Sequence, residues 1–147
     1  MIKVDLKTDL SFLKEYVELC ALEWGKPKNN IEIQDKINLI LSGDKVISVL
    51  GIVEDRKLIG FISLFKYDGD ERKDLSPWYA TMYVKEEYRG NGYSKVLNEM
   101  IIEEAIKLGY KRIYLKTDLN NYYEKFGAIY VEDLKCGEKL YYIDCVK

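Results

Sequence analysis

The stretch Trp78-Tyr79-Ala80-Thr81-Met82-Tyr83-Val84 is followed, four residues later, by Arg89-Gly90-Asn91-Gly92-Tyr93-Ser94. The first segment is rich in aromatic and β-branched residues, which predicts a strand. After the second segment, apolar residues recur at helical spacing, at Tyr93, Val96, Leu97, Met100, Ile101, Ala105 and Leu108. Gly109 stands where the C-terminal cap of such a helix is expected. The sequence therefore predicts a strand, a glycine-bearing turn and an amphipathic helix.

This turn has the composition of an anion-binding site. A turn that opens a helix directs several backbone N–H groups and the positive end of the helix dipole at one point. Gly90 and Gly92 would let an anion approach the backbone without a Cβ in the way. Arg89 adds a fork of donors suited to phosphate oxygens. We interpret residues 89–94 as a pyrophosphate-binding turn; a plain connection, with glycines for geometry alone, is the alternative.

Two other phosphate-binding loops do not match this turn. The Walker motif ends in Gly-Lys-Ser/Thr, and no such ending follows Gly92. The dinucleotide-binding motif requires a third glycine at position 95, which is Lys95 here.

The stretch from Val84 to Ser94 resembles the acetyl-CoA-binding motif of the GNAT superfamily of N-acetyltransferases, Arg/Gln-x-x-Gly-x-Gly/Ala. Arg89 and Gly92 match the motif, and Ser94 replaces its last small residue. The resemblance implies acetyl-CoA as cofactor, with the pyrophosphate bound at Arg89, Gly90, Asn91, Gly92, Tyr93 and Ser94. It further implies that the backbone of Met82, Tyr83 and Val84 pairs with the pantetheine amides, as an added strand would.

A second motif follows about thirty residues later. The segment from Asn120 to Ala128 resembles the family's Leu-Tyr-Glu-Lys-x-Gly-Phe motif, with Tyr123 at its tyrosine and Gly127 at its glycine. By this resemblance Tyr123 is the general acid that protonates the departing thiolate. In a chain with thirteen tyrosines, a half-buried structural tyrosine is the alternative. The asparagine that many members carry about seven residues before the tyrosine is Lys116 here, so Asn120 and Asn121 receive no role.

The reaction implied is attack of a primary amine on the acetyl-CoA thioester. The oxygen that gains negative charge needs a donor, which by resemblance is a backbone N–H near Met82 or Tyr83. The amine must lose a proton, yet the strand from Trp78 to Val84 has no carboxylate and the chain has no histidine. Glu23, Asp118 and a water-mediated path remain open as the base.

By the resemblance to the GNAT superfamily, the acceptor site is built from the first two helices, the start of the central strand and the last hairpin. Glu23, Trp24, Trp78 and Tyr79 lie in these regions and could surround an amine, although packing in the core is the commoner role for such residues. We expect an N-acetyltransferase acting on a small-molecule amine. A protein lysine or N-terminal acetyltransferase and a non-catalytic CoA-binding module are the alternatives.

Length and composition limit the other possibilities. The 147 residues suit one domain, residues 1–147, and a net charge of −2 argues against nucleic-acid binding. Three cysteines without metal-ligand spacing, and no histidine, predict reduced thiols, no metal site and a cytoplasmic protein. We expect no membrane association, and a monomer or homodimer.

The predicted order is strand, two helices, three strands, helix, strand, short helix and two strands. The strands are expected at 2–6, 46–53, 57–67, 78–84, 111–116, 128–132 and 139–146. The first helix is expected to be capped by Thr8 and ended by Gly25-Lys26-Pro27, the second to be capped by Asn29 or Asn30, and the short one to span 120–126. Residues 68–74 form a charged run that predicts a solvated loop. The fold class is mixed α+β; by resemblance it is a mostly antiparallel central sheet, flanked by helices and splayed between its fourth and fifth strands.

Overall fold

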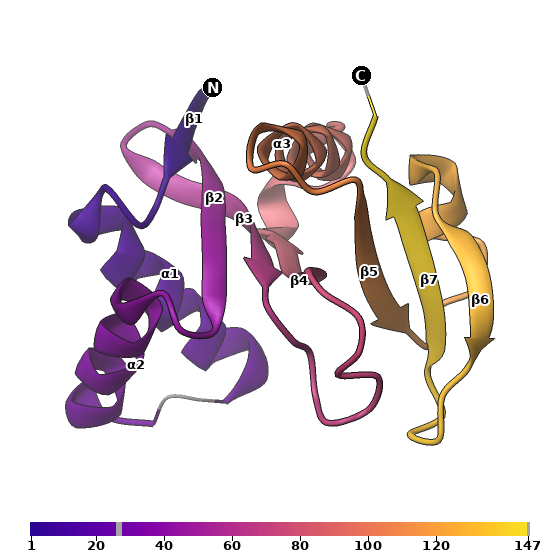
Figure 1. Ribbon diagram of the computed structural model, residues 1–147. Coiled ribbons are helices and arrows are strands. Elements are labelled where there is room, and N and C mark those ends of the chain that lie inside the picture. The colour runs from indigo at the N-terminus through magenta and orange to yellow at the C-terminus, as the bar shows by residue number, and fades with distance from the viewer. Residues whose placement is uncertain (26–27, 147) are drawn as a thin grey trace.

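The computed structural model describes residues 1–25 and 28–146 and contains a seven-stranded sheet in the order β1-β2-β3-β4-β5-β7-β6 (Figure 1). Its elements are β1 (Ile2–Asp5), α1 (Leu10–Trp24), α2 (Asn30–Ser42), β2 (Val46–Glu54), β3 (Lys57–Phe65), β4 (Trp78–Val84), η1 (Glu86–Tyr88), α3 (Tyr93–Lys107), β5 (Arg112–Thr117), η2 (Tyr123–Phe126), β6 (Ile129–Asp133) and β7 (Lys139–Asp144). Lys26 and Pro27, which were expected to end the first helix, lie outside the described residues. The predicted order of helices and strands is confirmed.

Helices cover both faces of the central strands. Residues of β2 and β3 alternate between two buried clusters, as the twofold period of a strand requires. Ile52, Ile59, Ile62 and Leu64 pack with α3, whereas Val49, Val53, Leu58 and Phe61 pack with α1 and α2. Because both faces are buried, β2 and β3 are almost continuously apolar in sequence.

The sheet opens between β4 and β5. β4 is antiparallel to β3 along most of its length, whereas β4 and β5 are parallel and, within the described chain, are paired only at Trp78 opposite Tyr114. β5 then pairs with β7 from Arg112 to Thr117. The two strands therefore separate beyond Trp78, which leaves the edge of β4 toward Val84 without a neighbouring strand. The predicted splay between the fourth and fifth strands is confirmed.

A β-bulge interrupts β4 where this separation begins. Ala80 is opposite Ser63 and Tyr83 is opposite Phe61, so Thr81 and Met82 together face Ile62. Thr81 has a φ of 50°, in the left-handed region that β-branched residues rarely adopt. A bulge of this kind disrupts the ladder locally and bends the strand.

Helix ends differ from the predictions in detail. Asn29 caps α2 as expected, its side chain accepting a hydrogen bond from the Glu32 N–H at 2.9 Å. Thr8 does not cap α1: Asp9 occupies the N-cap position, and the Thr8 hydroxyl donates to the Asp5 carbonyl instead. The short helix predicted over 120–126 is a 3₁₀ helix that spans only Tyr123–Phe126. Residues 118–122, which lead into it, are not helical.

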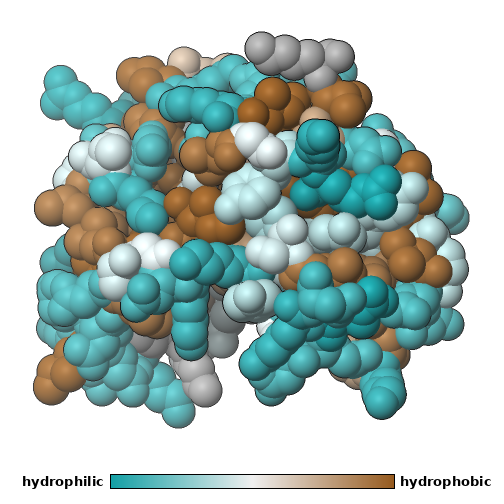
Figure 2. Space-filling model, viewed as in Figure 1, coloured by the Kyte–Doolittle hydropathy of each residue, from teal (hydrophilic) through white to brown (hydrophobic). Residues whose placement is uncertain are grey.

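The charged run 68–74 is a loop, as predicted, and it docks on the far end of the sheet. Figure 2 shows hydrophilic residues at the lower edge of the view, where this loop and the β6–β7 turn lie. Arg72 pairs with Asp74 and with Glu132 of β6. The Glu71 carboxylate accepts from the N–H groups of Lys135 and Cys136. The loop is solvated on one side and bound to the last hairpin on the other.

Candidate active site

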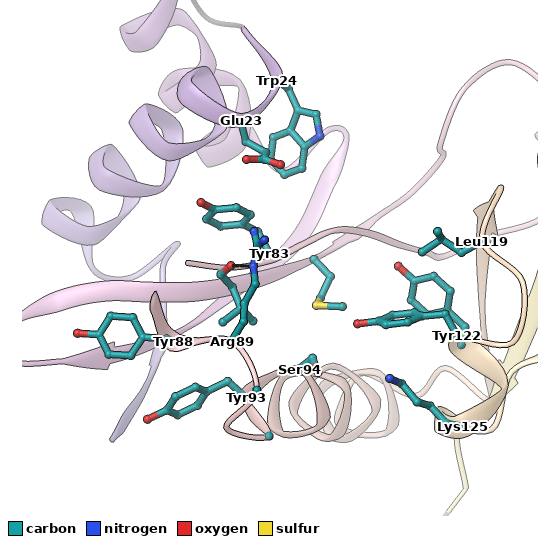
Figure 3. A pocket seen from close by; sticks show the side chains of 15 residues that line it. Glu23, Trp24, Tyr83, Tyr88, Arg89, Tyr93, Ser94, Leu119, Tyr122 and Lys125 are labelled. Atoms are coloured by element: carbon teal, nitrogen blue, oxygen red, sulfur yellow. Dashed lines mark hydrogen bonds between the residues drawn. The ribbon is translucent and has the colours of Figure 1, made fainter. Parts of the chain in front are cut away.

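A cleft of about 480 Å³ lies where β4 and β5 separate (Figure 3). Its lining comes from the end of α1, from β4, from the turn into α3 and from the segment around η2. The lining residues are Glu23, Trp24, Met82, Tyr83, Val84, Tyr88, Arg89, Gly90, Gly92, Tyr93, Ser94, Leu119, Tyr122, Tyr123 and Lys125. The structure thus brings together, from segments distant in sequence, every residue predicted to bind acetyl-CoA or to act as the acid, except Asn91.

The turn into α3 presents backbone to the cleft. Gly90 and Gly92 have φ values of 79° and 81°, which favour glycine, and a Cβ built on either would meet no atom within 4 Å. The first hydrogen bond of α3 runs from the Val96 N–H to the Gly92 carbonyl, so the N–H groups before Val96 have no intrahelical partner. The helix dipole adds positive potential at the same place.

Arg89 and Asn91 both stabilise this turn through hydrogen bonds, and Arg89 also carries a positive charge. The Arg89 Nε donates to the Val84 carbonyl at 2.8 Å, and the guanidinium lies 5.6 Å from the centroid of the Tyr83 ring. The Asn91 Nδ2 donates to the carbonyls of Tyr88 and Arg89, on the turn itself. The Asn91 side chain therefore holds the turn together and does not face the cleft.

Tyr93 also has a structural contact. Its hydroxyl donates to Glu54 Oε1 at 2.6 Å, which ties the first turn of α3 to the end of β2. This hydrogen bond raises the pKa of the Tyr93 phenol, because the carboxylate accepts the phenolic proton. The ring lines the cleft and its polar tip points to the neighbouring strand.

The opposite wall consists of aromatic side chains. Tyr123 opens η2, and its ring is edge-on to Tyr122, with centroids 4.8 Å apart, and to Tyr79, with centroids 5.7 Å apart. Lys125 lies with its Nζ 4.1 Å from the centroid of the Tyr122 ring. Burial, and secondarily the neighbouring Tyr122, raises the pKa of Tyr123 to about 12. The phenol is therefore a proton donor throughout the neutral range.

Two of the predicted acceptor residues belong to the core. Trp78 is buried, packs against the tilted ring of Tyr114 and donates from Nε1 to the Leu75 carbonyl at 2.8 Å. Tyr79 is buried behind Tyr123, and burial holds its pKa well above the usual range. Among the described residues its hydroxyl has no hydrogen-bond partner. For Trp78 and Tyr79, packing is the correct interpretation.

The other two acceptor candidates lie at the mouth of the cleft. Glu23 and Trp24, from the C-terminal end of α1, are exposed, and Trp24 is 6.2 Å from Tyr83 between ring centroids (Figure 3). Glu23 is the one carboxylate among the described residues that line the cleft. Asp118, also considered as a base, is exposed and is not part of the lining.

Sequence analysis missed four lining residues. Tyr88 precedes the motif arginine, Leu119 approaches η2, and Tyr122 and Lys125 are within the second motif. Only Lys125 had a usable signal, since a lysine two residues after the candidate acid lies on the same turn. Neither Tyr88 nor Leu119 differs in sequence from an ordinary surface residue.

The cleft has the features that an acyl-CoA requires. It joins a backbone N–H cluster that contains two glycines, the unpaired edge of a strand, and a phenol that stays protonated. Among residues 1–25 and 28–146, no cluster of His, Cys, Asp or Glu side chains could hold a metal ion, and no helix is long and apolar enough to cross a membrane.

Comparison with known proteins identifies this arrangement. Residues 12–128 match the model of the acetyltransferase (GNAT) family. No curated protein sequence matches the chain. Similar solved structures include the aminoglycoside 6'-N-acetyltransferase from Enterococcus faecium, with 16% identity, a TM-score of 0.75, and coverage of 100% of this chain and 98% of that one. An aminoglycoside 6'-N-acetyltransferase complexed with coenzyme A has 16% identity, a TM-score of 0.74 and coverage of 100% and 98%.

A third similar structure is that of yncA from Salmonella typhimurium with its cofactor acetyl-CoA, at 14% identity, a TM-score of 0.68, and coverage of 100% of this chain and 95% of that one. At these identities the structures establish the shared fold, and the family match covers most of the chain. The chain belongs to the GNAT family of acetyltransferases: it has the GNAT fold, is an N-acetyltransferase and uses acetyl-CoA.

Proposed function

We propose that this GNAT acetyltransferase transfers the acetyl group to a primary amine of a small molecule by direct attack on the thioester, with Tyr123 as general acid. One observation carries the proposal. A single cleft joins the glycine turn of α3 to Tyr123 across the unpaired edge of β4. An extended ligand bound at the turn and along that edge would bring its far end to the phenol.

The proposal assigns the two parts of the β4–α3 wall different tasks. The turn over residues 89–94 would hold the pyrophosphate through the N–H groups at the start of α3, because these have no intrahelical partner and lie at the positive end of the helix. The backbone of Met82, Tyr83 and Val84 would pair with the pantetheine amides, because no strand among residues 1–25 and 28–146 occupies that edge. Acetyl-CoA supplies an acetyl group activated as a thioester.

The protein itself would then have three roles. A backbone N–H at the β4 bulge, near Met82 or Tyr83, would stabilise the negative charge that develops on the carbonyl oxygen. The Tyr123 hydroxyl would give its proton to the departing sulfur, for which its buried, protonated state suits it. The half-exposed entrance by Glu23 would admit the amine.

The acceptor we propose is a cationic amine of low molecular weight. Glu23 offers a carboxylate at the cleft mouth, and Trp24 and Tyr83 offer aromatic faces beside it. Glu23 can hold an ammonium group and, directly or through water, accept its proton before attack. The similarity in fold to aminoglycoside N-acetyltransferases supports an acceptor with several amines.

Two other functions make different demands on this cleft. A protein acetyltransferase would need a groove that holds an extended peptide, whereas the proposed acceptor side consists of Glu23 with the aromatic rings of Trp24 and Tyr83. A non-catalytic CoA-binding module would not need a protonated phenol at the end of the cleft. Both are outcomes that the following experiment can reveal.

The test has two stages. A thermal-shift titration with acetyl-CoA, with ATP and NAD as controls, should show stabilisation by acetyl-CoA alone, about 2.7 kcal/mol at a hundredfold excess over its dissociation constant. Thiol release is then followed with polyamines, aminoglycosides, amino acids and lysine peptides as acceptors. Turnover with polycationic amines supports the proposal. Turnover confined to peptides, or binding without any turnover, would replace it with one of the two alternatives.

A further inference from the structure

Three hydroxyl groups from three separate elements form a hydrogen-bonded chain beneath the cleft. The Thr81 hydroxyl of β4 donates to the Ser63 Oγ of β3 at 2.7 Å. The Ser63 Oγ lies 3.2 Å from the hydroxyl of Tyr16 on α1. Ser63 and Tyr16 are fully buried, and burial raises the pKa of Tyr16, which keeps its proton in place. None of the three residues lines the cleft.

This hydrogen-bonded chain ends at Thr81, the one non-glycine residue within the described strands that has a positive φ. Thr81 is β-branched and has a φ of 50°, a conformation that persists only where surrounding contacts over-determine it. Its one hydroxyl is bonded to Ser63, which is opposite the preceding residue, Ala80. The hydrogen bond to the buried Ser63 is such a contact, because the Thr81 hydroxyl would lose it if β4 returned to a regular ladder.

The strain has a consequence for the cleft wall. Because Thr81 and Met82 share one partner, Ile62, the bulge sets the register of the residues that follow. A regular ladder would shift Met82 and Tyr83 by one position and turn each side chain to the other face. Met82 and Tyr83 form the cleft wall at the point where the backbone donor is proposed.

We propose that the Tyr16–Ser63–Thr81 chain is a positioning device: it holds the β4 bulge and so fixes the backbone of Met82 and Tyr83 at the reaction site. The inference rests on the proposed function, in which that backbone stabilises the developing negative charge. The three hydroxyls touch neither the acetyl group nor the amine. They act through the peptide groups of β4.

The first comparison is Thr81→Val against Thr81→Ser. Valine keeps the β-branched shape and removes the hydroxyl, whereas serine keeps the hydroxyl. Thr81→Val should lower kcat by about tenfold to a hundredfold, because small displacements of a catalytic group have effects of this size. Thr81→Ser should stay within about threefold of the unchanged enzyme. Affinity for acetyl-CoA, measured by titration calorimetry, should change less than kcat.

Substitution of the other two hydroxyl residues, Ser63 and Tyr16, should also lower kcat. Ser63→Ala removes the central hydroxyl and should lower kcat about as much as Thr81→Val does. The double variant should lower kcat no further than either single variant. Tyr16→Phe removes the last hydroxyl and should have a smaller effect in the same direction. If Thr81→Val does not fold, Ser63→Ala and Tyr16→Phe carry the test.

Matched controls separate positioning from general loss of stability. Ser48→Ala alters a buried serine of the adjacent strand β2, Tyr114→Phe a half-buried tyrosine of β5, and Thr8→Val a hydroxyl bonded to the Asp5 carbonyl. These three variants should keep kcat within about twofold. Equal losses of kcat in controls and chain variants, or an unchanged kcat in Thr81→Val, would overturn the inference.

A measurement without substrate distinguishes failure of this inference from failure of the proposed function. Hydrogen exchange and amide chemical shifts at Met82 and Tyr83 are followed by NMR in the ligand-free variants. Faster exchange and shifted resonances in Thr81→Val, restored in Thr81→Ser, support the positioning role even if no amine is turned over. Unchanged resonances would refute it whatever the activity.

Discussion

The two walls of the cleft are built from different parts of the polypeptide. The β4–α3 wall is mainly backbone: two glycines at positive φ, the unpaired N–H groups of a helix start and the open edge of a strand. The η2 wall is mainly side chains, with Tyr123 held edge-on between Tyr122 and Tyr79. The proposed function assigns ligand binding to the first wall and proton transfer to the second, so variants in each should affect different kinetic constants.

The largest difference between the effect on kcat and the effect on acetyl-CoA affinity is expected for Tyr123→Phe. The substitution keeps the ring and its edge-on contacts and removes only the phenolic proton, so kcat should fall by about a hundredfold or more while acetyl-CoA affinity stays within about twofold. Thiol release and titration calorimetry measure the two quantities. Tyr130→Phe, on the exposed strand β6, is the matched control. Undiminished turnover would remove Tyr123 from the mechanism.

The backbone wall is tested at the two ends of α3. Gly92 and Gly109 have φ values of 81° and 88°, and a Cβ on either meets no atom within 4 Å, but only Gly92 lines the cleft. Alanine at either position should cost about 1 kcal/mol of unfolding free energy, because the left-handed conformation is strained. Only Gly92→Ala should also weaken acetyl-CoA binding, by about tenfold, since its methyl group would occupy the ligand's approach.

Denaturant unfolding and calorimetry of the two glycine variants make this comparison. Equal affinities for acetyl-CoA would mean that the turn is a connection without a ligand. The protein itself leaves room for a side chain at Gly92, so steric exclusion of the pyrophosphate would arise only when the ligand is bound.

Substitution of Arg89 should have a smaller effect, divided between acetyl-CoA binding and the free energy of unfolding. Arg89→Ala removes both the bond to the Val84 carbonyl and the charge, and should weaken acetyl-CoA binding several-fold and lower the unfolding free energy by about 1 kcal/mol. Arg89→Lys keeps the charge without the planar fork. Binding at several salt concentrations separates the two contributions: a salt-independent loss shared by both variants would make Arg89 a brace of the turn and not a phosphate ligand.

The smallest effect is expected in the pH dependence. The folded pKa of Tyr123, about 12, lies above its ordinary value of about 10, so folding favours the protonated phenol. That stabilisation is complete below about pH 10 and is lost as the pH rises from about 10 to 12. The difference in unfolding free energy between the unchanged protein and Tyr123→Phe should therefore be constant from pH 7 to 10. The rate should show no descending limb in this range.

The sequence predicted the backbone wall more completely than the aromatic wall. Glycine spacing, an arginine and the apolar period after residue 93 are local features, and all three are where they were expected. Trp78 and Tyr79 resemble site residues in composition, but the structure buries both. Their role depends on which face of β4 meets β5 and α3, and the bulge at Thr81 changes that face partway along the strand.

Local chemistry thus determined the elements, the turn and the family, because hydrophobic period, glycine placement and motif spacing act over a few residues. Tertiary structure alone decided that Glu23 and Trp24 reach the cleft, that Asn91 braces its own turn, and that hydroxyls from α1, β3 and β4 meet at a strained threonine. These contacts join residues far apart in the chain. Packing fixes such contacts, and no local pattern in the sequence encodes them.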